Sequence, residues 1–344
     1  MTLANKGVAL CSYAGIAGEH QITYLLEAHA CLSKGLQLGV NPEAVDVFSK
    51  YLGAIEKNLP DKKILDNPSK FPGYKIKARS KFERYLIEFC LEHGLYLNIC
   101  GVCKKCDAAI GDTLVIKQML VPAKSDHYLR LSSYLNQIKQ DYITARFLLI
   151  LSQYKGLNLN FVDRNVKIID TFDYSVHNIY VQLIKESFKS FYNILDKIAC
   201  FINDYLGLRI DERNVTFRKI WYSDWKTKTV RKRIGATMNT SLNALFDVYR
   251  DFENGPYSKL RKTRNALTHR FVNIRKFQDI ENEENMTEET FFKQTLELAR
   301  IVKNSISYLM HFVYVEERKK QLQVDGNTFQ LYAQAVQDKL KTCR

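Results

Sequence analysis

Hydrophobic residues recur along this chain at the spacing of helices. The longest pattern covers residues 172–206, where apolar side chains return every three or four positions and Gly207 provides a natural stop. Similar patterns cover residues 125–154, with Ser125 as the predicted N-cap, and residues 287–320, with Thr287 as the cap. The alternation typical of a strand is visible only in residues 113–120. The pattern therefore predicts an all-α protein built on a bundle of long helices.

Shorter helical patterns precede and interrupt this bundle. Residues 3–14, 19–36 and 42–59 predict three helices whose small side chains would allow close packing. Residues 58–74 contain three prolines and predict a linker, whereas residues 80–93 predict an amphipathic helix. Residues 241–251 and 256–270 predict two short helices, and Pro256 suits the first turn because its missing N–H costs nothing there.

The sequence RKTRNALTHRF, residues 261–271, contains the most informative chemistry. Asn265 and His269 are i, i+4 neighbours on one helix face, and the long side chain of Arg264 can reach the same edge. A guanidinium holds phosphate oxygens bidentately, and an imidazole moves protons near neutral pH. The three residues are therefore candidates for binding and cleaving a phosphodiester. The alternative is that they cap the helix, pair with carboxylates or face solvent.

Charge favours the first interpretation. The 344 residues carry a net charge of +14, and residues 218–276 alone contain fifteen Lys/Arg and four Asp/Glu. A local charge of +11 attracts polyanions. Within it, the sequence WYSDWKTKTVRKR, residues 221–233, mixes two Trp and one Tyr with cations, a combination suited to single-stranded nucleic acid. The alternative for both Trp is a buried anchor. The predicted RNA-binding residues are Lys226, Lys228, Arg231, Lys232, Arg233, Lys259, Arg261, Lys262 and Arg270.

The motif also carries a family resemblance. An Arg followed at once by Asn, with His five positions after the Arg, resembles the Arg-x4-6-His signature of the HEPN superfamily. Residues 79–98 (RSKFERYLIEFCLEHGLYLN) and 134–149 (YLNQIKQDYITARFLL) resemble a bacterial HEPN branch with TPR-type helices at its N-terminus, and residues 5–38 resemble its degenerate TPR segment. The similarity covers most of the chain.

The resemblance implies a helical bundle that cleaves RNA without a metal or other cofactor, in a toxin or phage-defence setting. Two motif helices would meet in a homodimer, with His269 as general acid or base and Arg264 as phosphate stabiliser. Asn265 would orient the His or bond a phosphate oxygen. In one toxin–antitoxin class of the superfamily a Tyr that the antitoxin modifies lies two residues after the His. Here that position is Phe271, which argues against inactivation by that route.

The patterns and the resemblance together divide the chain into four parts. We expect a TPR-like helical region over residues 1–60, a linker and helical, Cys-rich connecting segment over 61–124, a HEPN bundle over 125–323 and a C-terminal helix over 324–344. The N-terminal helices are a candidate surface for a protein partner.

Cys100, Cys103 and Cys106, with His93 upstream, form the second chemical candidate. Three thiols and an imidazole can complete a tetrahedral zinc site, but the spacing lacks the usual distant second pair. We therefore predict no metal, with His93 as a structural side chain. Eight Cys and an N-terminus without a signal-like pattern indicate reduced thiols in a cytoplasmic protein, and no apolar run approaches the length of a membrane span.

The sequence thus favours a HEPN-type endoribonuclease acting on RNA, including tRNA. Two alternatives remain: an RNA- or nucleotide-binding HEPN module without catalysis, and a protein-interaction adaptor that uses the TPR-like helices. Asp196 and Glu186 are candidates to orient the motif, or are solvated charges, and Tyr142 and Arg146 are candidates for packing and salt bridges in the bundle.

Overall fold

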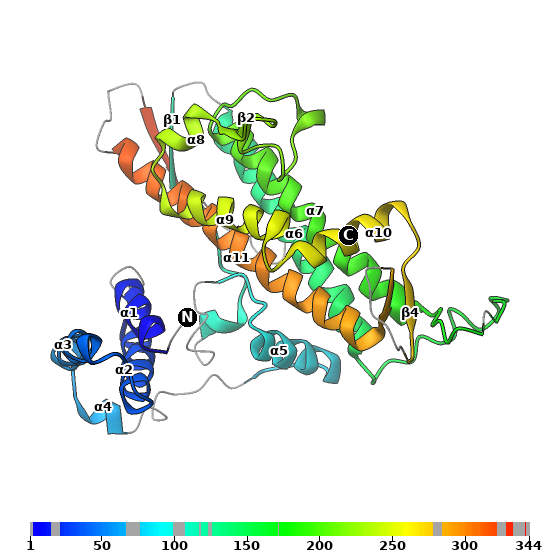
Figure 1. Ribbon diagram of the computed structural model, residues 1–344, viewed down its shortest axis with the longest axis horizontal. Helices are drawn as coiled ribbons and strands as arrows, with labels where there is room; N and C mark the ends of the chain where they lie inside the picture. Colours follow the sequence, from blue (N-terminus) through cyan, green and yellow to red (C-terminus); the bar gives the residue numbers. More distant parts are fainter. Residues whose placement is uncertain are drawn as a thin grey trace. The chain divides into compact units, whose positions relative to one another are not determined.

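The computed structural model describes residues 3–14, 21–66, 76–98, 107–116, 118–122, 126–170, 172–277, 284–321, 328–332 and 341 (Figure 1). The chain forms two compact units. Unit 1 comprises Met1–Ala78 and Asn98–Thr113, and unit 2 comprises Arg79–Leu97 and Leu114–Arg344. The predicted connecting segment, residues 61–124, is therefore divided between the two units.

Unit 1 is a small helical assembly. Its helices are α1 (Leu3–Ala14), α2 (Gln21–Gln37), α3 (Pro42–Asn58) and α4 (Lys63–Asp66), with the 3₁₀ turn η3 (Asp107–Ile110). The first two helices approach closely because glycines line their contact: a Cβ at Gly7 would lie 2.6 Å from Cγ of Leu32. Asn41 begins α3 by accepting a hydrogen bond from the backbone N–H of Glu43.

Unit 2 is mostly helical, which confirms the predicted all-α class. Its helices are α5 (Lys81–His93), α6 (His127–Gln153), α7 (Ile179–Tyr205), α8 (Lys232–Ala236), α9 (Thr240–Asn254), α10 (Ser258–His269) and α11 (Glu288–Gln321), with the 3₁₀ turn η4 (Glu212–Asn214). Its strands are β1 (Gln118–Pro122), β2 (Tyr222–Asp224), β3 (Thr229–Val230), β4 (Asn273–Arg275), β5 (Asn285–Thr287) and β6 (Thr328–Tyr332).

Helix α7 is the centre of this bundle and packs against both α6 and α11 (Figure 1). Its apolar face is completely buried, and Phe188 stacks on Phe291 of α11 with ring centroids 5.7 Å apart. One buried carboxylate joins three elements. Glu317 of α11 accepts hydrogen bonds from the N–H of Leu120 in β1 (2.6 Å) and from the hydroxyl of Tyr205 in α7 (2.7 Å).

Three predicted boundaries differ from the observed ones. Helix α7 begins at Ile179 with Asn178 as its cap, and not at residue 172, because Phe172 and Tyr174 have φ angles of 56° and 60° that a right-handed helix cannot contain. Helix α6 begins at His127, while the predicted cap Ser125 lies outside the described residues. The motif helix begins at Ser258, two residues after Pro256.

The predicted C-terminal helix over residues 324–344 is wrong for its central part. Residues Thr328–Tyr332 form strand β6, which pairs antiparallel with β1 in the register Gln118↔Tyr332 to Pro122↔Thr328. The β-branched and aromatic side chains of this segment suit a strand, but a strand needs a partner. Here the partner is a segment about two hundred residues earlier, so the pairing was not visible locally.

Candidate active site

The motif residues lie at the C-terminal end of α10. Leu260, Thr263 and Ala266 form the buried face of this helix, and the Thr263 hydroxyl donates to Oε1 of Gln294 in α11 at 3.0 Å. This contact fixes the rotation of α10, which leaves the motif face directed away from the core.

Arg264 is held at the surface by an aromatic ring. Its guanidinium lies 5.3 Å from the ring centroid of Tyr192 in α7, and Nη1 donates to Oδ1 of Asn265 at 3.3 Å. Burial raises the pKa of Tyr192 to about 12, while the nearby charge of Arg264 opposes that rise. Arg264 is therefore pre-positioned but half-exposed, so its remaining donors can reach a phosphate.

A carboxylate supports the same arrangement. Asp196 lies one turn after Tyr192 on α7 and accepts a hydrogen bond from the backbone N–H of Phe217 at 2.8 Å. Burial raises its pKa, and the charge of Arg264 acts in the opposite direction. Of the two carboxylates proposed to orient the motif, Asp196 interacts with Arg264, whereas Glu186 pairs with Lys189 of its own helix.

His269 is the last residue of α10 and is exposed. Within the described part of the chain its imidazole has no hydrogen-bond partner. Asn265, one turn earlier, is exposed as well. Residues four apart on a helix lie about 6 Å from one another, so Asn265 and His269 can contact one phosphodiester. One protomer thus offers an anchored guanidinium, an amide and an unengaged imidazole at the C-terminal end of α10.

The basic residues around the motif fall into two groups. Lys259 and Lys262 of α10 are exposed. Arg261 instead pairs with Glu253 at 3.1 Å, and Arg270 pairs with Glu284 at 2.7 Å. Lys259 is therefore better placed for a phosphate than the two arginines, whose charges are already partly neutralised.

The segment 221–233 forms the hairpin of β2 and β3 and the start of α8. Lys226, Lys228 and Lys232 are exposed on it. Arg231, by contrast, donates from Nε to the carbonyl of Ile220 at 3.0 Å. Arg233 donates from Nη1 to the carbonyls of Leu206 (2.7 Å) and Gly207 (2.8 Å) and so caps the end of α7. These two arginines hold the hairpin on the bundle.

Both Trp rings of this segment are engaged by groups of the protein itself. Trp221 is fully buried and donates from Nε1 to the carbonyl of Phe217 at 2.6 Å, as the alternative interpretation predicted. Trp225 is partly exposed, but Lys228 Nζ lies 3.0 Å from its ring centroid and the Arg218 guanidinium 4.5 Å from it. The protein's own cations occupy this ring.

The predicted zinc ligands are only partly described. His93 ends α5, packs edge-on against Phe89 and lies beside Arg300, whose Nη2 is 3.3 Å from Nδ1 of the imidazole. Cys100, Cys103 and Cys106 lie outside the described residues. In the ranges that are described, no cluster of metal-ligating side chains occurs. The prediction of no zinc stays a prediction.

Tyr142 and Arg146, which the sequence offered as candidates for packing and salt bridges, have packing roles in the bundle. The Tyr142 hydroxyl and Arg146 Nη1 both donate to the carbonyl of Leu95 at 3.0 Å, and both side chains are buried. They join α6 to the end of α5.

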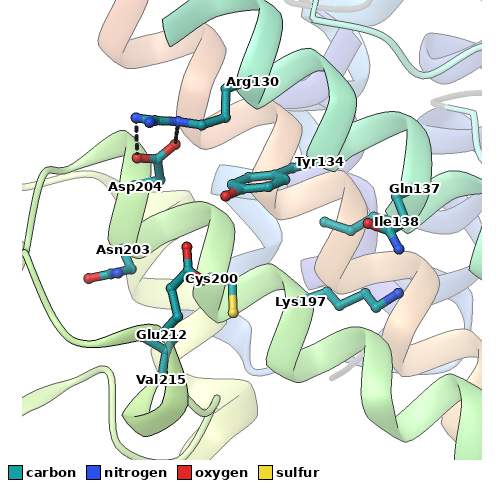
Figure 2. Close-up of a pocket in the computed structure, with 10 residues that line it drawn as sticks. All are labelled: Arg130, Tyr134, Gln137, Ile138, Lys197, Cys200, Asn203, Asp204, Glu212 and Val215. Atoms are coloured by element: carbon teal, nitrogen blue, oxygen red, sulfur yellow. Dashed lines mark hydrogen bonds and ion pairs between the residues drawn. The ribbon is translucent and has the colours of Figure 1, made fainter.

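A cavity of about 320 Å³ lies between α6, α7 and η4 (Figure 2). Arg130 and Asp204 face each other across its edge in a two-bonded ion pair, with both distances 2.7 Å. Lys197, also in its wall, is hydrogen-bonded to Asp141. Because its cations are already paired with carboxylates, and because it contains none of the motif residues, this cavity is a weaker phosphate site than the end of α10.

Sequence reasoning missed Tyr192, the ring beneath Arg264. The available signal was weak: Tyr192 and Asp196 are i, i+4 neighbours on α7, on the edge of its buried stripe.

Comparison with known proteins places the chain in a family. Residues 123–316 match the family model of the LA2681-like HEPN proteins. No curated protein and no solved structure matched the chain. None of the helices in the described part of the chain has both the length and the apolar character that crossing a membrane requires. Since the matched segment is more than half of the chain and includes the whole motif helix, the protein belongs to the LA2681-like HEPN family.

Proposed function

We propose that this protein is a metal-independent endoribonuclease with Arg264, Asn265 and His269 as its catalytic residues. The observation that supports this most directly is their grouping at the exposed end of α10, where Tyr192 holds the Arg264 guanidinium beside Asn265. Membership in the HEPN superfamily, where ribonucleases are common, points the same way. So does the charge of the surrounding sequence.

The chemistry needs only the substrate and these side chains. The ribose 2′-OH attacks the adjacent phosphorus, and the bond to the 5′ oxygen breaks, leaving a 2′,3′-cyclic phosphate and a 5′-OH. One imidazole takes the 2′-OH proton and another gives a proton to the leaving oxygen, each transfer typically worth about 10²–10⁴-fold. Arg264 neutralises the charge that accumulates on the phosphoryl oxygens.

A single chain supplies one His269 and one Arg264. Two protons must be moved on opposite sides of the phosphorus, so two α10 helices from a homodimer form the complete site in this proposal. Light scattering should then give roughly twice the 40.0 kDa chain mass. A fully active monomer would contradict the two-helix site.

The biological setting we propose is a cytoplasmic toxin or phage-defence effector. Its substrate is cellular RNA, including tRNA. Phe271 occupies the position of the Tyr that is modified in one toxin class, and a phenyl ring has no hydroxyl to modify. Control of the enzyme must therefore act elsewhere, and the helices of unit 1 are the candidate surface for a protein partner.

The test compares wild type with His269→Ala, Arg264→Ala and the control Arg250→Ala, whose guanidinium is exposed on α9. In EDTA, wild type and the control should cut single-stranded RNA or tRNA loops and create new 5′-OH ends, while the two motif variants should not. Melting curves should show all four folded. Cleavage retained in both motif variants would refute the assignment.

One alternative function has specific support. The exposed lysines of the β2–β3 hairpin and α10 suit RNA binding whether or not cleavage follows. If wild type binds RNA but never cuts it, and His269→Ala binds equally well, the protein is an RNA-binding HEPN module.

A further inference from the structure

Four aromatic side chains are exposed on the segment that follows α10 and on the loop before α7. They are Phe172, Tyr174, Phe271 and Phe277, with exposed fractions of 89%, 68%, 89% and 70%. Single exposed apolar residues are ordinary, but several on two connected segments indicate a binding surface.

Backbone contacts connect these two segments, which come from distant parts of the chain. The N–H of Val176 donates to the carbonyl of Ile274 at 2.6 Å, and the N–H of Lys276 donates to the carbonyl of Tyr174 at 3.1 Å. The loop before α7 is thereby attached to β4, directly after the motif helix (Figure 1). About one hundred residues separate the two segments in the sequence.

Side chains reinforce this attachment and direct the rings outward. Arg275 Nη2 lies 3.3 Å from Oδ2 of Asp173, and the rings of Tyr174 and Phe277 meet edge to face with centroids 5.9 Å apart. Val272 is buried, so the alternation of an extended chain turns Phe271 to the solvent side.

The loop adopts a costly backbone conformation to present its rings. Phe172 and Tyr174 both have positive φ, which is unusual for aromatic residues. Asp170 and Asp173 stabilise these turns by accepting hydrogen bonds from the N–H groups of Phe172 (2.9 Å) and Ser175 (3.2 Å). Such strain is retained mainly at functional positions.

A cation and a hollow lie beside these rings. Lys276 is exposed next to Phe277, whereas Arg270 and Arg275 of the same segment pair with Glu284 and Asp173. The hollow, of about 390 Å³, lies between the end of β4 and the start of α11 and is lined by Arg275, Lys276, Phe277, Thr287, Glu288 and Glu289. It combines a ring face, positive charge and carboxylate acceptors, which are the groups that bind a splayed-out base.

We propose that Tyr174, Phe271 and Phe277, with Lys276, form a stacking platform for unpaired RNA bases, which begins at Phe271 beside the phosphate at His269. This inference rests on the proposed function and deepens it, because it selects single-stranded RNA over duplex as the substrate. A cation beside exposed aromatic rings, in a segment of high positive charge, favours a nucleic acid over an uncharged protein surface. The platform also takes the role that sequence reasoning gave to Trp221 and Trp225, whose faces are occupied.

The test measures binding, so that it does not depend on cleavage. The probe is a single-stranded RNA with 2′-methoxy groups, which cannot form the cyclic phosphate. Stacking is worth about 1–3 kcal/mol per base, so each ring changed to Ala should raise Kd about fivefold or more, and the triple variant about a hundredfold. Phe271→Trp should retain binding. Phe161→Ala, which removes another exposed ring of the same loop, should have no effect.

Two results would overturn the platform. The first is an unchanged Kd for the triple variant, or an equal loss of affinity for duplex RNA, whose bases cannot reach the rings. The second is a drop from dimer to monomer in the triple variant, which would assign the rings to a second copy of the chain. If wild type does not cleave RNA but the ring variants still bind RNA more weakly than wild type, the proposed ribonuclease activity is refuted and the platform is retained.

Discussion

The salt dependence of RNA binding is the prediction that the structure sharpens most. Of the five cations in the hairpin and α8, Lys226, Lys228 and Lys232 are exposed, whereas Arg231 and Arg233 are bonded to backbone carbonyls. Changing the three lysines to Ala should therefore remove phosphate contacts. It also removes the contact of Lys228 with the Trp225 ring, which lies within the hairpin and not in the bundle.

The magnitude follows from counterion release. Each phosphate contact to a single strand contributes about 0.7 to the slope of log K against log salt, so three contacts contribute about 2. Between about 50 and 200 mM salt, wild type should lose about sixteenfold more affinity than the triple variant. The variant should bind more weakly at low salt and approach wild type as salt rises.

Fluorescence anisotropy with the 2′-methoxy RNA over a salt series measures this slope. Arg233→Ala provides the contrast, because it removes the cap on α7 and should lower the free energy of unfolding by about 1 kcal/mol. Identical slopes for wild type and the lysine variant would show that the hairpin does not contact the RNA, and the reasoning from exposure would fail.

Three further outcomes are expected. Glu317→Ala leaves buried donors without an acceptor and should lower the free energy of unfolding by about 3–5 kcal/mol. Glu289→Ala, in an exposed pair, should leave the free energy of unfolding nearly unchanged, and equal denaturation midpoints for the two variants would contradict this. Burial raises the pKa of Asp196, so the folded protein holds the carboxyl proton more tightly than the unfolded chain does. The contribution of Asp196 to stability therefore falls as pH rises from the ordinary carboxyl range through the raised pKa. Asp196→Asn should remove that decline. The melting temperature of the variant minus that of wild type should therefore be higher at neutral than at acidic pH, and a difference that does not change with pH would argue against the raised pKa. Protein purified without added metal should carry well under one zinc per chain, and Cys103→Ser should barely change the melting temperature; stoichiometric zinc lost in that variant, with a large drop in melting temperature, would establish a structural metal site.

The sequence alone determined the helices and the motif, because both depend on local spacing. Residues 3–14 were predicted and observed as α1, and the long helices α6, α7 and α11 followed from their three-to-four residue periodicity. Helix hydrogen bonds join residues four apart, so a short window contains their cause. The same holds for Asn265 and His269, which one helix places on one face whatever surrounds it, whereas the position of the Arg264 guanidinium also depends on Tyr192 of α7.

Only the tertiary structure decided which side chains are available to contact RNA. Trp221 and Arg233 look as exposed in the sequence as Trp225 and Lys232, yet one is buried and the other caps α7. The pairing of β1 with β6 depends on a partner far away in the chain, as does the cluster of Tyr174 with Phe277. Burial and strand pairing are set by what packs opposite, and no local pattern contains that information.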